Sequence, residues 1–76
     1  MTIYDFLNTY FGDALAARIQ TVDIDFGVLE LETLPIDDII RDARYVDYRI
    51  ARVLQWRTMS FTWDTGEREE MLVITI

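Results

Sequence analysis

Apolar residues recur at two different spacings along this chain, and the change of spacing limits the folds it can adopt. Near the N-terminus they lie three or four positions apart, at Ile3, Phe6, Leu7, Tyr10 and Phe11, which is the spacing of one helix face. Most later segments instead alternate apolar and polar residues, which is typical of strands with one buried face. We therefore expect an α+β fold.

Two helices are expected. Thr2 and Asp5 resemble a capping box, so the first helix should span residues 2–11, and Gly12 should end it. Pro35 introduces a shorter second helix, because proline fits the first helical turn. The apolar face of that helix would comprise Ile36, Ile39, Ile40 and Ala43.

The first two strands are expected to form a hairpin. Residues 17–25 contain an alternating segment, and residues 28–33 contain another. The apolar positions change parity at Gly27, which indicates a tight turn or a bulge there. The second strand should therefore pair back onto the first.

A second hairpin is expected to complete the chain. Its first strand covers 53–63, with a bulge near Arg57, where the apolar parity changes. A turn at 64–67 contains a glycine, and a closing strand covers 71–76. The sequence thus predicts one domain over residues 1–76. Its order would be α-β-β-α-β-β, with an antiparallel four-stranded sheet and two helices on one face.

The composition argues against catalysis. The 76 residues include no cysteine and no histidine, which excludes disulfides, thiol catalysis and Ser-His or Cys-His arrangements. The glycines do not form a phosphate-binding loop, and no apolar run reaches the roughly 18 residues of a membrane helix. We expect a non-enzymatic protein with no cofactor, no metal and no membrane contact. A chain this short buries only about 60% of its unfolded surface, so a partner could share in its stability.

Charge is distributed unevenly. The net charge is −7, which disfavours direct binding to nucleic acid. Residues 21–40 hold six acids and no base, whereas residues 41–57 are rich in arginine. We call these six acids the acidic stripe: Asp23, Asp25, Glu30, Glu32, Asp37 and Asp38. Asp23 and Asp25 should share one strand face, as should Glu30 and Glu32. The stripe is either a solvated surface or an imitation of a nucleic-acid backbone directed at a basic groove of another protein.

Two tryptophans lie in the long strand on opposite parities, Trp56 and Trp63. A sheet covered by helices on one face leaves its other face in water, so one apolar set should be exposed. Both tryptophans are candidates for partner binding, with core packing as the alternative.

Three segments resemble small acidic proteins of bacteriophages and mobile elements: the opening Met-Thr-Ile-Tyr-Asp-Phe-Leu, the central Leu-Pro-Ile-Asp-Asp-Ile-Ile and the closing Met-Leu-Val-Ile-Thr-Ile. Anti-CRISPR inhibitors are similar chains. The resemblance implies a protein that inhibits a host CRISPR-Cas complex by occupying a basic groove, in the cytoplasm of a bacterial host cell. The acidic stripe would steer the encounter, and a tryptophan would anchor it. The alternative is a homo-oligomeric accessory or regulatory domain, in which the arginine segment meets the acidic stripe of a second copy.

Overall fold

The first helix begins one residue later than the sequence predicts, after the N-cap Thr2, and it also ends earlier. The computed structural model describes residues 1–10 and 12–76, so Phe11 of the expected helix lies outside the described residues. Helix α1 spans Ile3–Thr9. The capping box is present, with Thr2 Oγ1 accepting from the Asp5 N–H at 3.1 Å and the Asp5 carboxylate accepting from the Thr2 N–H at 3.2 Å.

The helix ends because Tyr10 has an extended backbone, with φ −80° and ψ 130°. Gly12 was expected to end it, but the C-cap is Tyr10, two residues earlier. A Cβ added to Gly12 would collide with the Tyr10 ring. This glycine therefore permits close packing and does not cap the helix.

The strands form one four-stranded sheet, in the order β2-β1-β4-β3. The predicted α+β class and the α-β-β-α-β-β order are confirmed, with a 3₁₀ turn added after the second helix. The antiparallel sheet is wrong, because β1 and β4 pair in parallel and the sheet is mixed. The strand bounds are β1 Ala16–Asp23, β2 Gly27–Pro35, β3 Gln55–Thr62 and β4 Arg68–Thr75.

The composition of β4 fits its central place. Met71 to Thr75 are all buried, whereas β3 at the sheet edge is mostly exposed. Leu72 and Ile74 join the core beneath the helices, so Met71 and Val73 face the opposite side. Met71 and Val73 are also buried, so this part of β4 is shielded on both faces and its sequence is almost continuously apolar.

Helix α2 follows β2 directly and is shorter than expected. It spans Ile36–Ile40, and a separate 3₁₀ helix, η1, covers Ala43–Val46. Ile39 is fully buried, but Ala43, assigned to the same apolar face, is exposed and opens η1. In the described part of the chain, no helix is long and apolar enough to span a membrane.

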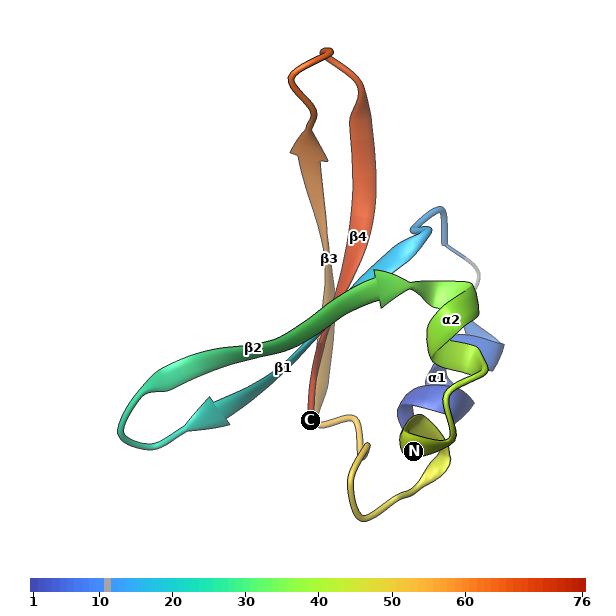
Figure 1. Ribbon diagram of the computed structural model, residues 1–76, viewed down its shortest axis with the longest axis vertical. Coiled ribbons are helices and arrows are strands. Elements are labelled where there is room, and N and C mark those ends of the chain that lie inside the picture. Colours follow the sequence, from blue (N-terminus) through green and yellow to red (C-terminus); the bar gives the residue numbers. More distant parts are fainter. Residues whose placement is uncertain (11) are drawn as a thin grey trace.

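The two hairpins diverge and leave their tips uncovered (Figure 1). The β1–β2 hairpin extends to the left of the view and the β3–β4 hairpin upward, while the helices lie at the lower right. The core lies between the helices and the crossing of the hairpins. The molecule is accordingly flat and broad, 39 × 32 × 16 Å.

Both turns are confirmed, and the bulge is displaced. Gly27 (φ 76°) and Gly66 (φ 87°) take the positive φ that glycine tolerates best. The bulge expected near Arg57 is wrong, because β3 and β4 keep one register throughout. The register shifts instead between Ile19 and Gln20 of β1, where β2 contributes Leu31 as an extra residue.

Candidate interaction surface

The end of the β1–β2 hairpin carries four exposed apolar side chains, which we call the arm tip: Val22, Ile24, Phe26 and Val28. Ile24 is 98% exposed and Phe26 is 78% exposed. Val22 and Val28 are cross-strand partners, each 61% exposed. Single exposed apolar residues are common, but four on one projecting turn form a patch that favours contact with another molecule.

The turn that carries the arm tip is held by Asp23. Its Oδ1 accepts from the backbone N–H of Asp25 at 2.7 Å and of Phe26 at 3.1 Å. Gly27 then supplies the positive φ that starts the return strand. Asp23 therefore has a local structural role, since its carboxylate fixes the turn that presents Ile24 and Phe26.

The acidic stripe is not one surface. Asp25 belongs to the turn and not to a strand, so the strand face predicted for Asp23 and Asp25 is wrong. Glu32 lies opposite Ile19, which is buried beneath the helices, and Glu30 lies opposite Gln20 after the register shift. The bulge thus places Glu30 and Glu32 on opposite faces, where a shared face was expected.

Glu30 has partners within the hairpin. Its Oε1 accepts from the Thr33 hydroxyl at 2.7 Å and lies 3.6 Å from Arg18 Nε. The second contact is an ion pair too long for a hydrogen bond. The charge of Glu30 is therefore partly balanced on the sheet face opposite the helices.

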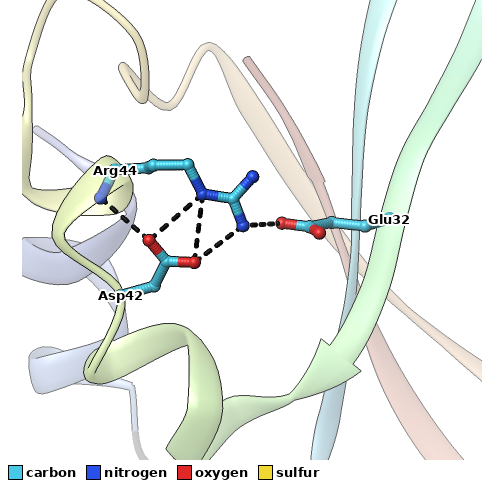
Figure 2. Close-up of polar contacts among 3 residues, drawn as sticks. All are labelled: Glu32, Asp42 and Arg44. Atoms are coloured by element: carbon cyan, nitrogen blue, oxygen red, sulfur yellow. Dashed lines mark hydrogen bonds and ion pairs between the residues drawn. The ribbon is translucent and has the colours of Figure 1, made fainter.

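Glu32 pairs with the arginine segment (Figure 2). Arg44 Nη2 lies 2.8 Å from Glu32 Oε1 and 2.7 Å from Asp42 Oδ2, so the guanidinium bridges the two carboxylates. Hydrogen bonds from Arg44 hold the pKa of Asp42 below its ordinary value, and Asp42 raises the pKa of Arg44. This contact joins η1 to β2.

A second ion pair lies within the arginine-rich residues 41–57 and balances the charge of Arg49. Arg49 Nη2 lies 3.2 Å from Asp47 Oδ2, and this hydrogen bonding lowers the pKa of Asp47. The Arg52 guanidinium lies over the Tyr48 ring, with its Cζ 5.7 Å from the ring centroid, and that of Arg44 lies over the Tyr45 ring at 5.1 Å. Two of the five arginines in residues 41–57 are thus paired with carboxylates of the chain itself.

The remaining acids of the stripe lie apart. Asp37 and Asp38 occupy the first turn of α2 and are exposed, whereas Asp25 lies at the far end of the β1–β2 hairpin. In the described residues none of these three makes an ion pair within 4 Å. The stripe therefore divides into an arm group (Asp23, Asp25 and Glu30) and an α2 group (Asp37 and Asp38), while Glu32 is paired with Arg44.

Trp56 lies at the rim of the core. It is paired with Ile74 and thus shares the helix-covered face. Its ring centroid lies 5.0 Å from that of Phe6 and 6.4 Å from that of Tyr10. These three rings, with Met1 and Leu54, help to line a groove of about 620 Å³. Half of Trp56 is exposed, so it packs against α1 and also borders the groove.

Trp63 lies elsewhere, beyond the end of β3. Its ring packs edge-on against Phe61, with the centroids 4.9 Å apart. It is also half exposed. The structure therefore brings neither tryptophan together with the arm tip.

The arm tip is the surface that the sequence analysis missed. A signal was present, because the helix expected over residues 2–11 would be about 15 Å long, whereas a strand of eight residues is about 27 Å long. Helices this short cannot cover hairpins of that length. The alternating residues nearest the turn had to remain exposed.

Comparison with known proteins assigns no relationship. No family model matches the chain, and no curated protein or solved structure is significantly similar to it. Among the described residues, no group of three or more acidic side chains gathers as a metal ion would require.

Proposed function

We propose that this protein acts by binding a protein partner and that the arm tip makes the central contact. The observation that carries the proposal is the exposure of Ile24 and Phe26 on a turn fixed by Asp23. Burial of one large apolar side chain contributes about 1.5–3 kcal/mol. A turn already held in one conformation loses little entropy on binding, so more of that energy remains for affinity.

Charges around the arm tip favour a partner with a basic rim. Asp25 lies between Ile24 and Phe26, and Glu30 lies further along β2. A specific interface usually combines an apolar centre with polar groups at its rim. The acids would speed the encounter, and the apolar side chains would hold the complex together.

Within this class, we propose inhibition of a host defence complex in a bacterial cell, as the resemblance to small acidic phage proteins implies. The partner would be a CRISPR effector, whose nucleic-acid groove is basic. The imitation of nucleic acid would rest on the arm group of acids, since Glu32 is paired with Arg44. The other candidate, an arginine segment that meets the acidic stripe of a second copy, has less support because Arg44 and Arg49 pair internally.

A plaque assay tests this proposal. Bacteria carrying different CRISPR-Cas systems would express the protein and be infected with a targeted phage. We expect plaques to be restored in at least one system, and to be lost with Ile24→Ser combined with Phe26→Ser. Ile50→Ser is the matched control, because Ile50 is exposed outside the arm.

Two results would contradict the proposal at different points. If no system is inhibited, the assignment to host defence is wrong. If inhibition survives the arm-tip substitutions, the arm tip is not the contact.

A further inference from the structure

The two edges of the sheet differ in how well they are protected. The edge strand β2 has a register shift at Leu31, the acids Glu30 and Glu32, and Pro35 at its end. Bulges, charges and proline are features that prevent an edge from pairing with another strand. The other edge strand, β3, has a continuous register and contains one charged residue, Arg57.

The backbone hydrogen-bonding groups of β3 that point away from β4 can be assigned. The Trp63 N–H donates to the Glu67 carbonyl at 2.8 Å, and this pair continues the β3–β4 register. Backbone groups alternate in direction along an antiparallel strand, so the odd-numbered residues bond to β4. The N–H and C=O groups of the even-numbered residues point away from the sheet: Trp56, Thr58, Ser60 and Thr62.

We propose that β3 pairs antiparallel with β3 of a second copy, about a two-fold axis beside Met59. In that register Thr58 lies opposite Ser60 of the second copy, and Trp56 lies opposite Thr62. Every outward-pointing backbone group of the strand then has a partner. A shift by two residues in either direction would leave Trp56 or Thr62 unpaired by the other strand.

The side chains of this register also fit one another. Arg57 would lie opposite Phe61 of the second copy, a cation–π pairing. Gln55 would lie opposite Trp63, and Met59 opposite itself. Because Arg57 is the one charge of β3, no like charges oppose each other. This self-complementarity favours a second copy over a foreign strand as the occupant of the edge.

The dimer is independent of the proposed function, because the arm tip lies on the other hairpin. A dimer would carry two arm tips. The arm-tip variant with Ile24→Ser and Phe26→Ser should therefore remain dimeric. Conversely, a variant that prevents dimer formation should still make the arm-tip contact with the partner.

Proline at the edge provides the first test. Thr58→Pro removes an outward N–H but no hydrogen bond to β4, and proline is tolerated at such edge positions. Light scattering at micromolar concentration should give a dimer mass for the wild type and the matched control Thr58→Ala, and half that mass for Thr58→Pro. A monomeric wild type, or a dimeric Thr58→Pro protein, would overturn the proposal.

A cross-link tests the register without depending on the proline variant. Cα atoms of a non-hydrogen-bonded antiparallel pair lie about 4.5 Å apart, within disulfide range. The chain has no cysteine, so Met59→Cys introduces a unique thiol beside the two-fold axis. Under mild oxidation Met59→Cys should form a covalent dimer much faster than Thr65→Cys, in the turn after β3. Equal rates for the two variants would show that this register is wrong.

Discussion

The guanidinium of Arg44 lies 2.8 Å from the carboxylate of Glu32 and joins η1 to β2. Arginine in this segment could have paired either within the chain or across an interface. Arg44 pairs within the chain, and Glu32 is thereby removed from the surface available to a basic partner.

The Arg44 cluster should make stability depend on pH. Arg44 holds the pKa of Asp42 below its ordinary value of 3.8, so the folded state favours the charged carboxylate. The stabilisation is complete above the unfolded pKa and is lost as the pH falls through the lower folded pKa. We expect Asp42→Asn to lower the melting temperature at neutral pH, and the difference from wild type to shrink in acid.

Asp64→Asn is the control for that measurement, because Asp64 lies in the β3–β4 turn and makes no ion pair within the described residues. It should change the melting temperature little at either pH. A difference between wild type and Asp42→Asn that stays constant down to acid pH would show that the ion pair does not stabilise the fold.

Asp23 and Asp25 should differ in their effect on stability. Asp23 accepts two backbone N–H groups in the turn, whereas the Asp25 side chain accepts none in the described structure. Asp23→Ala should cost about 1 kcal/mol of unfolding free energy, the usual contribution of such hydrogen bonds. Asp25→Ala should change it by less than about 0.5 kcal/mol. Chemical denaturation of the two variants compares them directly, and equal losses would contradict the role of Asp23.

Local features of this fold could be predicted from the sequence, but the pairing of the hairpins could not. The capping box at Thr2 and the turns at Gly27 and Gly66 depend on residues close together in the chain. The parallel contact between β1 and β4 joins residues 55 positions apart, as in Ala17 opposite Leu72. One clue was available, since the continuous apolar run of β4 is typical of a strand buried on both faces.

The candidate site was predicted only in part, for a similar reason. Glu30 and Glu32 share a face in a regular strand, and one extra residue at Leu31 separates them. Bulges depend on how two strands meet, and the sequence of one strand rarely reveals them. The exposure of Ile24 and Phe26 follows from what the helices fail to cover, which depends on the whole arrangement.

The arm tip and the core should respond differently to truncation. Ile39 is fully buried, so Ile39→Ala should cost about 2–5 kcal/mol through lost burial and the cavity left behind. Ile24 is almost fully exposed, so Ile24→Ala should change stability by less than about 0.5 kcal/mol. Thermal unfolding of both variants measures this contrast. A large loss for Ile24→Ala would mean that the arm tip contributes to folding, and its exposure would then need another explanation.

Charge at the arm should affect the rate of partner binding, and equal charge elsewhere should affect it less. Asp25 lies within the arm tip and Asp38 on α2, and both are exposed. Asp25→Asn and Asp38→Asn change the net charge equally, so a difference between them reports where the partner approaches. We expect Asp25→Asn to slow association with the inhibited complex several-fold at low salt, and Asp38→Asn to slow it much less. The difference should disappear as the screening length falls from about 10 Å at 0.1 M salt to about 3 Å at 1 M. If stopped-flow measurements gave both variants the same rate at every salt concentration, the arm acids would have no part in steering, and the apolar residues alone would have to account for recognition.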